Sequence, residues 1–484
     1  MSIKEFLVNQ RFTLKEALPV IDANAHGLCF IVNDTNHLLG ILTDGDIRRV
    51  LIKELPPSTC VTDVMNKNFT KLTTNASNEA ILQTLSKKIK VIPLVDKDGV
   101  VVDFATPNRL RRIPVSEPLL DGNELAYVAD CVRTTWVSSK GKYVDKFQEQ
   151  FKDYCQVPHA LAVSNGTVAL HLALEALGIG IGDEVIVPNL TFAASINAII
   201  YTGATPVIAD IDPITLNISP TAIEELITGR TKAIMPVHLY GYPCEMDEIS
   251  RIAARHNLFV VEDCAEALGS TYKGKAIGSF GDAATFSFFG NKTITTGEGG
   301  MVLFKDKAVA QKAAVLKDHG MSKTKRYWHD FVGYNYRMTN LQAALGVAQM
   351  ERIEQFVQKK RAIADIYTKQ FQQIEGLSLP LDSKSHYNTF WLYTIIINNE
   401  AVRIDTLMED LLAEGVETRP IFYPLNIMPL YQPYCKNQTF PNSKLIEGKG
   451  ISLPSSTNLS LKEAKFVAEK ISKHLAYQLE HSIL

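Results

Sequence analysis

Residues 160–178 read Ala160-Leu-Ala-Val-Ser-Asn-Gly-Thr-Val-Ala-Leu-His-Leu-Ala-Leu-Glu-Ala-Leu-Gly178. The first four residues are apolar, as in a short buried strand. Thr167–Leu177 follows a helical pattern, and Gly178 is the residue type that closes helices. A strand that runs through a polar turn directly into a helix predicts an α/β fold.

The same alternation continues along the chain to about residue 305. The short apolar runs are Ala160–Val163, Glu184–Val187, Pro206–Ile211, Ala233–Val237, Leu258–Glu262, Ala284–Phe289 and Gly300–Phe304. Helical patterns lie between most of them, which predicts a mostly parallel sheet covered by helices on both faces. From residue 356, a helical pattern, a strand at Phe390–Asn398 and a helix near 403–414 predict a smaller C-terminal α+β lobe.

The composition excludes several classes of protein. The chain has 484 residues, of which 46% are hydrophobic and 21% charged, and no apolar run reaches the roughly 20 residues of a membrane-spanning helix. A net charge of −2 argues against a nucleic-acid binder. The seven cysteines include no CxxC pair, so we expect neither a disulfide framework nor a metal site. Residues 1–12 lack the apolar stretch of a signal peptide, and we expect a cytoplasmic protein.

The first hundred residues contain a faint internal repeat. Cys29–Asp34 followed by Gly40–Asp46 aligns with Ile92–Lys97 followed by Asp103–Arg109. Each copy reads as a strand, a turn, a second strand and the start of a helix. Two such halves predict one small α/β unit, which we expect to span residues 1–112.

Leu39-Gly-Ile-Leu-Thr-Asp-Gly-Asp-Ile-Arg-Arg49 resembles the signature of CBS domains, paired modules that in many proteins bind nucleotides between their repeats. The resemblance implies that Thr43 meets a phosphate and Asp46 meets ribose hydroxyls. The second copy has Arg109 where the first has Asp46, so we expect one regulatory nucleotide per chain rather than two. The alternative is that Thr43 and Asp46 only cap a helix in a module used for assembly.

Polar residues follow three of the predicted strands, where ligands collect in an open α/β sheet. Ser164-Asn-Gly-Thr167 leads into a helix whose first N–H groups suit an anion such as phosphate. Asp263 follows one apolar run, and Lys292 follows another. Each alone also reads as a helix cap or a loop residue. Together, a phosphate cradle, an acid for a ring nitrogen and a lysine for an aldehyde predict a pyridoxal 5′-phosphate (PLP) site and chemistry of an amino group.

Residues 113 to about 480 resemble the DegT/DnrJ/EryC1/StrS family of sugar aminotransferases, which have PLP fold type I. The motifs that carry the resemblance are Asn165-Gly-Thr167, Pro188-Asn-Leu-Thr-Phe-Ala-Ala-Ser195, Glu262-Asp-Cys-Ala-Glu-Ala267, Ser287-Phe-Phe-Gly-Asn-Lys292, Thr295-Thr-Gly-Glu-Gly-Gly300 and Gly333-Tyr-Asn-Tyr-Arg-Met-Thr-Asn340. Within the family, Lys325-Arg-Tyr-Trp-His329 and Glu266 resemble the GDP-perosamine synthase branch. The resemblance implies transfer of an amine from L-glutamate to a nucleotide-linked keto sugar, at C4 of a 4-keto-6-deoxyhexose.

The family pattern also implies a role for each matching residue. Lys292 would hold PLP as an imine and move protons at the substrate carbon, and Asp263 would keep the pyridine nitrogen protonated. The other cofactor contacts would come from Gly166, Thr167, Phe192, Glu266, Ser287 and Asn335. Asn335 would be supplied by the neighbouring subunit, which implies a homodimer with shared sites. The substrate contacts would be His329, Arg337 and Arg419.

Two departures within the family bear on the reaction. Members often read Pro-Leu-His where this chain has Pro424-Leu-Asn426, and a dehydrating branch has histidine in place of Lys292. Lys292 therefore favours amino transfer over dehydration.

Two alternatives stay open. One is a UDP-linked N-acetyl 4-keto sugar as the substrate, and the other is a nucleotide-sensing regulatory protein built on the first module. In either case we expect three parts: a CBS-like pair at 1–112, a large PLP-binding domain at 113–355 and a small C-terminal domain at 356–484.

Overall fold

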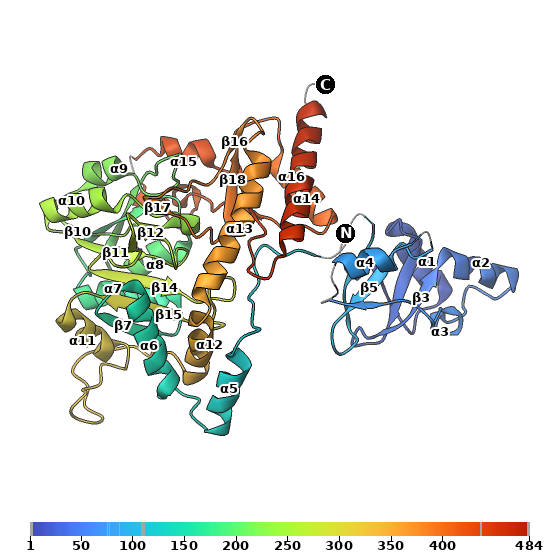
Figure 1. Ribbon diagram of the computed structural model, residues 1–484, viewed down its shortest axis with the longest axis horizontal. Helices are drawn as coiled ribbons and strands as arrows, with labels where there is room; N and C mark the ends of the chain where they lie inside the picture. The colour runs from blue at the N-terminus through green and yellow to red at the C-terminus, as the bar shows by residue number, and fades with distance from the viewer. Residues whose placement is uncertain are drawn as a thin grey trace. The chain divides into compact units, whose positions relative to one another are not determined.

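The computed structural model describes residues 3–74, 76, 78–86, 88–107, 112–435 and 438–481. They form two compact units (Figure 1). The first comprises Met1–Ile113 with Asp405–Glu417, and the second comprises Pro114–Ile404 with Thr418–Leu484. The domain boundaries expected at 112/113 and 355/356 stay predictions, and residue 355 lies inside helix α13 (Ile353–Phe371).

The first unit contains two small sheets with the same strand order. They are β1 (Leu7–Asn9), β2 (Leu28–Val32) and β3 (Leu38–Thr43), and β4 (Leu72–Thr73), β5 (Ile92–Val95) and β6 (Val101–Ala105). In each sheet the first two strands are parallel and the last two antiparallel. Phe6, Phe30, Val95 and Phe104 belong to one hydrophobic core that both sheets share. The internal repeat, and its pairing into one α/β unit, are confirmed.

The helices of the first unit are η1 (Ile3–Phe6), α1 (Leu14–Ala23), α2 (Asp44–Ile52), α3 (Val61–Val64), α4 (Asn78–Thr84) and, from Asp405 on, α14 (Ile404–Ala413). Helices α1 and α2 both begin with a capping box, Thr13 with Glu16 and Thr43 with Asp46. This pairing stabilises a helix start because each side chain satisfies a backbone N–H of the other residue. The helix start expected in the second copy falls at residues 108–111, outside the described residues.

The second unit is built on a seven-stranded sheet. Across the sheet the strands are β7 (His159–Val163), β15 (Gly300–Phe304), β14 (Ala283–Ser287), β11 (Phe259–Asp263), β10 (Thr231–Ile234), β8 (Glu184–Pro188) and β9 (Thr205–Ala209). Neighbouring strands are parallel except in the two pairs that involve β15. The mostly parallel sheet is confirmed, with a strand at each of the seven predicted runs.

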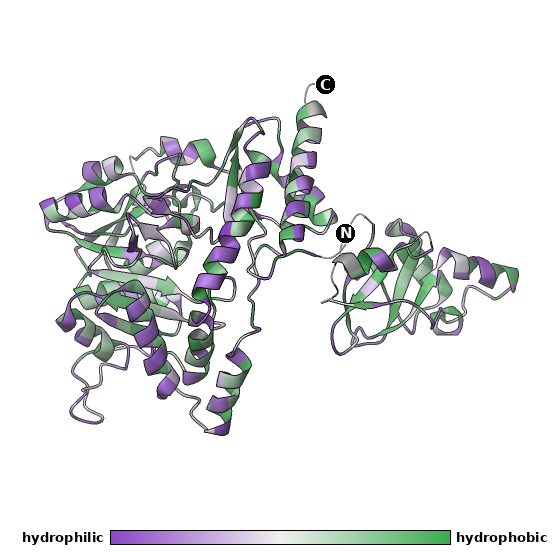
Figure 2. Ribbon diagram, viewed as in Figure 1, coloured by the Kyte–Doolittle hydropathy of each residue, from purple (hydrophilic) through white to green (hydrophobic). Residues whose placement is uncertain are grey.

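Successive residues along these strands face opposite layers of helices. Ala162 and Ile186 belong to one core, and their neighbours Val163 and Val187 belong to another. The first core includes residues of α5 (Glu124–Arg133), α6 (Lys142–Cys155), α9 (Pro220–Leu226), α10 (Met246–His256) and α12 (Asn340–Met350). The second includes residues of α7 (Gly166–Leu177), α8 (Ala193–Tyr201) and α11 (Lys307–Leu316). The helix ribbons accordingly alternate between hydrophilic and hydrophobic segments in Figure 2.

The last part of the second unit is smaller and of α+β type, as predicted, but the helix predicted near 403–414 is α14, which belongs from Asp405 on to the first unit. Its antiparallel sheet has the order β16 (Leu377–Ser378), β18 (Tyr393–Ile397), β20 (Gly450–Leu453) and β19 (Arg419–Pro420), and α13 packs with α16 (Leu461–His481). The remaining short elements are β12 (Thr271–Tyr272), β13 (Lys275–Ala276), β17 (His386–Tyr387), η2 (Leu239–Gly241), η3 (Leu425–Ile427), η4 (Gln432–Tyr434) and α15 (Pro441–Ile446). Across the described ranges, no helix has both the length and the apolar character needed to cross a membrane.

Candidate active site

The carboxyl ends of β7, β11 and β14 lie along one edge of the large sheet. Val163 at the end of β7 pairs with Gly300 of β15, and Gly300 pairs on its other side with Ser287 at the end of β14. Thr285 of β14 pairs in turn with Asp263 at the end of β11. The turns that follow these strands therefore open at the same edge, which is where open α/β sheets bind ligands.

Helix α7 begins directly against the end of β14. A Cβ atom on Gly166, the first residue of the helix, would lie 2.8 Å from the Cβ of Ser287, so glycine is required for this close approach. Asn165 caps the helix by accepting a hydrogen bond from the Val168 N–H at 3.0 Å. The N–H groups of Gly166 and Thr167 have no acceptor within the helix. With the Ser287 hydroxyl, they form a set of donors that suits a phosphate group.

Asp263 is buried, and two uncharged donors hold its carboxylate. The Ser195 hydroxyl donates to Oδ2 at 2.7 Å, and the Ala265 N–H donates to Oδ1 at 3.1 Å. Burial raises the pKa of Asp263, although these hydrogen bonds and the charge of Lys292 oppose the rise. A protonated pyridine nitrogen would supply the charged N–H partner that favours the ionised form of this carboxylate.

The Lys292 amine lies in a buried space beside an acid and an indole ring. Its Nζ is 3.6 Å from Glu266 Oε1 and 3.8 Å from the centroid of the Trp391 ring. Burial lowers the pKa of Lys292, while the charges of Glu266 and Asp263 oppose that effect. An amine with a lowered pKa has a larger uncharged fraction at neutral pH, which suits it to attack an aldehyde carbon.

Glu266 shares the buried space with Lys292. Its Oε2 accepts a hydrogen bond from the Tyr240 N–H at 2.9 Å. Burial raises the pKa of Glu266 to about 7, and the charge of Lys292 opposes the rise. Near neutral pH this carboxyl group can therefore either hold or release a proton.

Phe192 is an exposed aromatic residue close to this cluster. It is the residue before α8, three positions before Ser195, and 60% of its surface is exposed. Its ring centroid lies 5.9 Å from that of Phe422. An exposed phenyl ring near the buried carboxylate offers a face on which a flat aromatic cofactor can stack. With the phosphate donors, the acid and the amine, the described residues fit PLP.

Asn335, Arg337 and His329 lie together in a different segment. The Asn335 Oδ1 accepts hydrogen bonds from Arg337 Nε at 3.1 Å and from Nη2 at 3.0 Å. His319 joins this group, with its Nε2 3.1 Å from Arg337 Nη2 and its carbonyl oxygen 2.9 Å from His329 Nδ1. Within the described part of the chain, none of these hydrogen bonds reaches Lys292.

Asn335 is exposed because the residues on either side of it pack inward. The rings of Tyr334 and Tyr336 stack 4.7 Å apart, and both contact His171 of α7. Neighbouring residues of an extended segment face opposite sides, so Asn335 is turned outward. Its position at the surface is therefore a consequence of how the two tyrosines pack.

Arg419 begins β19, pairs with Ser452 of β20 and is half-buried. The same segment continues to Asn426, where family members often have histidine. Asn426 Oδ1 accepts a hydrogen bond from Asn189 Nδ2 at 2.7 Å, and the Asn426 N–H donates to Asn189 Oδ1 at 3.0 Å. In this chain the position therefore forms an amide pair that ties the segment to the loop after β8.

In the first unit, Thr43 and Asp46 bond to each other at the start of α2. Asp46 Oδ2 accepts hydrogen bonds from the Thr43 N–H at 2.9 Å and from its hydroxyl at 2.7 Å, and Oδ1 accepts one from Arg49 at 2.5 Å. Both residues thus act as helix caps, and their role in nucleotide binding stays a prediction. Arg109, on which the expected asymmetry of the module rests, lies outside the described residues.

Three residues that touch the predicted site were not singled out by sequence reasoning: Ser195, Tyr240 and Trp391. Ser195 ends a recognised motif, so the motif was the signal that could have found it. Tyr240 lies beyond β10 in a left-handed backbone conformation with φ 52°, and Trp391 lies just before β18. No local pattern marks these two, because segments that are far apart in the sequence bring them to the site.

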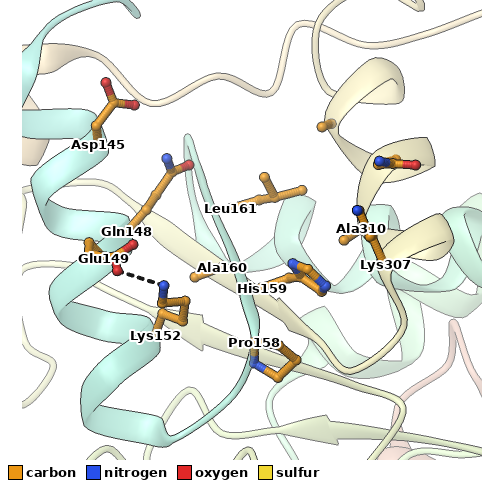
Figure 3. A pocket seen from close by; sticks show the side chains of 12 residues that line it. Asp145, Gln148, Glu149, Lys152, Pro158, His159, Ala160, Leu161, Lys307 and Ala310 are labelled. Atoms are coloured by element: carbon orange, nitrogen blue, oxygen red, sulfur yellow. Dashed lines mark hydrogen bonds and ion pairs between the residues drawn. The ribbon is translucent and has the colours of Figure 1, made fainter.

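A cavity of about 420 Å³ lies elsewhere, between α6, β7 and α11 (Figure 3). Lys152 and Glu149 form an ion pair at 2.6 Å on one wall, and Lys307 lies on the opposite wall. The residues that line this cavity include none of the predicted site residues. The cavity is therefore separate from the candidate site at the strand ends.

A buried group of potential metal ligands supports the strand that carries Asp263. Donor atoms of His238, Glu262 and Cys264 lie within 4.8 Å of one another. Glu262 accepts hydrogen bonds from three backbone N–H groups and faces His238 Nε2 at 3.2 Å. His238 Nδ1 accepts a hydrogen bond from the Cys244 N–H at 3.0 Å. Since internal hydrogen bonds occupy the carboxylate and both ring nitrogens, this group ties β11 to its surroundings.

Comparisons with known proteins cover both units. The DegT/DnrJ/EryC1/StrS aminotransferase family matches residues 118–472, and the CBS domain matches residues 1–53 and 61–115. GDP-perosamine synthase of Escherichia coli O157:H7 is 50% identical over 364 residues, which are 75% of this chain and 99% of that protein. GDP-perosamine synthase of Caulobacter vibrioides is 49% identical over 356 residues, which are 72% of this chain and 95% of that protein.

Solved structures resemble the second unit. Spr1654 of Streptococcus pneumoniae in its PLP form has a TM-score of 0.72 and 28% identity, covering 76% of this chain and 99% of that one. The same protein has also been solved in a PMP form, with a TM-score of 0.73. The aminotransferase TlmJ from Streptoalloteichus hindustanus has a TM-score of 0.72 and 30% identity, with the same coverage.

Proposed function

This chain belongs to the DegT/DnrJ/EryC1/StrS aminotransferase family, and from that membership we propose that it transfers the amine of L-glutamate to C4 of a GDP-linked 4-keto-6-deoxyhexose. It is a PLP-dependent nucleotide-sugar aminotransferase of fold type I, preceded by a CBS domain pair. The observation that carries the proposal is the Lys292 amine, on a side chain only 13% exposed, beside the buried Glu266 at the strand ends where the buried Asp263 lies. The choice of a GDP-sugar is supported by the 50% identity to a GDP-perosamine synthase over 99% of its length.

We assign the cofactor contacts by the chemistry of the residues present. PLP, when bound, withdraws electrons from the carbon that carries the amine. Lys292 would hold the aldehyde carbon, Asp263 the pyridine nitrogen and Glu266 the phenolic oxygen. The phosphate and the ring face are assigned to Gly166, Thr167, Ser287 and Phe192.

Lys292 is also the residue that moves the proton. Burial lowers its pKa, so more of the amine is uncharged and able to take a proton from the substrate carbon than in an ordinary lysine. Asp263 would hold the protonated ring nitrogen of bound PLP, and the opposite charges would favour the ionised form of its carboxylate. Because burial raises the pKa of Glu266 to about 7, its carboxyl group can also take up or release a proton during the reaction.

The substrate contacts are assigned to His329, Arg337 and Arg419. Guanidinium groups bind phosphate oxygens through two parallel hydrogen bonds, which suits the diphosphate of a sugar nucleotide. Arg337 donates a hydrogen bond to exposed Asn335 and also contacts His319, whose carbonyl oxygen contacts His329. Asn335, Arg337, His319 and His329 therefore form one polar surface patch. We propose that this patch serves the active site of a second subunit.

A panel of sugar nucleotides tests the choice of substrate. The purified chain would be incubated with L-glutamate and GDP-, UDP- or dTDP-linked 4-keto sugars, with 2-oxoglutarate as the measured product. We expect product with the GDP-linked 4-keto-6-deoxyhexose. Preference for a UDP-linked N-acetyl sugar would support that alternative instead. Nucleotide binding without any amino transfer would support the regulatory alternative.

We predict that each active site contains residues of two subunits. Lys292→Ala and Asn335→Asp subunits are each expected to be inactive, the second because a carboxylate would repel the cofactor phosphate. A mixed dimer holds one composite site with wild-type Lys292 and Asn335. An equal mixture, in which half of the dimers are mixed, should therefore regain about a quarter of the wild-type activity.

The control for this mixing experiment pairs Lys292→Ala with Asp263→Asn. If one subunit supplies both of these residues to a site, no mixed dimer holds an intact site and no activity returns. Absence of recovery in the Asn335→Asp mixture, with mixed dimers shown to form, would contradict shared sites.

We also predict that the first unit binds one nucleotide through Asp46. Asp46→Asn removes the charge that would accept two ribose hydroxyls, and loss of such a charged hydrogen bond costs about 1.5–3 kcal/mol, roughly one to two decades of affinity. Calorimetry of the full chain with AMP, ATP, GDP and sugar nucleotides measures the change.

The capping box of α1 gives a matched control for Asp46. Glu16→Gln disturbs the equivalent box at Thr13, where we assign no ligand. If Asp46 only caps its helix, both variants lose a similar amount of stability and no nucleotide gives heat with the wild type. Binding of two equal nucleotides per chain would contradict the expected single site.

The cysteines support a reducing location for this reaction. All seven are free, and five of them are buried. We propose that the enzyme works in the cytoplasm, where thiols stay reduced.

A further inference from the structure

The indole ring of Trp391 makes two different contacts with the segment that carries Lys292. Its Nε1–H donates a hydrogen bond to the carbonyl oxygen of Asn291 at 2.8 Å. The Lys292 Nζ lies over the ring face, 3.8 Å from the centroid. One side chain therefore contacts both the backbone next to the catalytic lysine and its amine.

A second hydroxyl donor makes the Asn291 carbonyl a fixed point. The Ser116 hydroxyl donates to the same oxygen at 2.9 Å. A carbonyl with two donors is held in both position and orientation, since each lone pair has a partner. Trp391 and Ser116 thus both fix the backbone directly before Lys292.

Trp391 is itself held tightly. The buried Lys360 amine donates to the Trp391 carbonyl oxygen at 3.1 Å and to the Ser455 carbonyl oxygen at 2.7 Å. Burial lowers the pKa of Lys360 to about 7. The Tyr240 ring stacks on the indole, with centroids 6.3 Å apart and planes at 12°. The indole is 4% exposed and fills a defined place.

The residue before Trp391 has an unusual backbone. Phe390 has φ 50°, a conformation that bulky residues rarely adopt. Its N–H donates to Asn388 Oδ1 at 2.7 Å, and the Gly241 backbone approaches so closely that a Cβ there would lie 2.9 Å from the backbone nitrogens of Phe390 and Trp391. Strained backbone of this kind persists where surrounding contacts enforce it, and such places concentrate at functional sites.

Three groups face the Lys292 amine. Glu266 lies 3.6 Å away, Asp263 is close enough for its charge to act on the amine, and the Trp391 ring covers another side. The face of an indole ring attracts a cation more strongly than a neutral amine. Trp391 therefore favours the charged amine while also limiting where it can move.

We propose that Trp391 is a positioning residue for amino transfer: it holds the free Lys292 amine beside Glu266 through its ring face, and anchors the Lys292 backbone through its indole N–H. The role in the reaction rests on the proposed function, whereas the effect on the amine does not. It is a property of the chain without cofactor.

The test measures the amine directly in cofactor-free protein. Acetic anhydride labels uncharged amines, so the pH dependence of labelling at Lys292, followed by peptide mass spectrometry, gives the protonation midpoint. Exposed Lys307 serves as the internal reference. We expect Trp391→Leu to lower the Lys292 midpoint by about one pH unit, a tenfold weaker hold on the proton. Trp391→Phe keeps a ring face and should shift the midpoint by less than half as much.

Measurements of turnover distinguish the hydrogen bond that Trp391 donates to Asn291 from the contact of its ring with the Lys292 amine. Both variants lose the hydrogen bond to Asn291, so we expect kcat to fall about tenfold in each with little change in KM for the keto sugar. Trp136→Leu is the matched control, since that side chain is 57% exposed and should change neither quantity. Trp391→Phe guards against misfolding, because it preserves most of the buried volume.

The results distinguish the positioning role from the substrate proposal. An unchanged Lys292 midpoint in folded Trp391→Leu and Trp391→Phe proteins would overturn the positioning role. Shifted midpoints in a chain that aminates no keto sugar would leave the effect on the amine standing and would reject the proposed substrate.

Discussion

Lys292→Ala should abolish amino transfer, with a loss of about 10⁴-fold or more, because it removes the amine that we propose both holds the cofactor and acts as the base at the substrate carbon. The fold should survive, because Glu266 keeps its hydrogen bond from the Tyr240 N–H and, with its pKa raised to about 7 by burial, can take up a proton when the amine is absent. Product formation from L-glutamate and thermal unfolding measure the two outcomes.

Borohydride treatment identifies the lysine independently of activity. In the wild type it should fix the cofactor on the peptide that contains residue 292, and in Lys292→Ala on none. Lys317 provides a matched control, because it is another partly buried lysine whose pKa burial lowers, to about 8, and its amine donates to the Ala162 carbonyl oxygen at 2.9 Å. Lys317→Met should keep its turnover. Cofactor fixed on any lysine other than 292 would refute the assignment.

Asp263→Asn should give the second largest loss, about two to three orders of magnitude in kcat/KM. Removing one partner of a buried charge pair costs about 3–5 kcal/mol, and here the unpaired partner would be the protonated ring nitrogen. Because burial raises the pKa of Asp263, a positively charged partner favours its ionised form. The bound cofactor should accordingly be held less tightly, which titration of the cofactor-free protein measures.

Ser195→Ala is the control for Asp263→Asn. It keeps the carboxylate and removes only the hydroxyl that donates to Oδ2 at 2.7 Å. A neutral hydrogen bond contributes about 1 kcal/mol, so a loss of less than tenfold is expected. The assignment of Asp263 would be wrong if Asp263→Asn retained as much activity as Ser195→Ala.

The sequence alone predicts the strands of the large sheet, the helix that follows the strand at residues 160–163, and the polar turns after the strands. It does not predict the roles tested by these variants. Short apolar runs, a capped helix closed by Gly178 and a lysine after a buried strand are short-range patterns, because neighbouring residues alone produce them. The structure has α7 at Gly166–Leu177 with Gly178 at φ 80°. The edge at which Asp263 and Lys292 meet followed from the parallel order of the strands.

The small lobe was less readable. Its strand at residues 390–398 was predicted, but Trp391 reads there as one more apolar residue at the start of a buried strand. Nothing in that segment indicates that the Trp391 ring will contact the amine of Lys292, which lies about a hundred positions earlier in the sequence. Likewise Asn426 looked like the loss of a histidine, and only packing showed its amide pair with Asn189.

The sequence by itself therefore determined the α/β architecture, the family and the residues that can carry the chemistry, since these depend on local periodicity and on motifs within single segments. Tertiary structure alone decided which side chains surround them: Ser195 contacts Asp263, and Trp391 and Glu266 lie beside Lys292. The physical reason is that the pKa and the position of a buried group depend on burial and on contacts from distant segments. Those contacts exist only once the chain has packed.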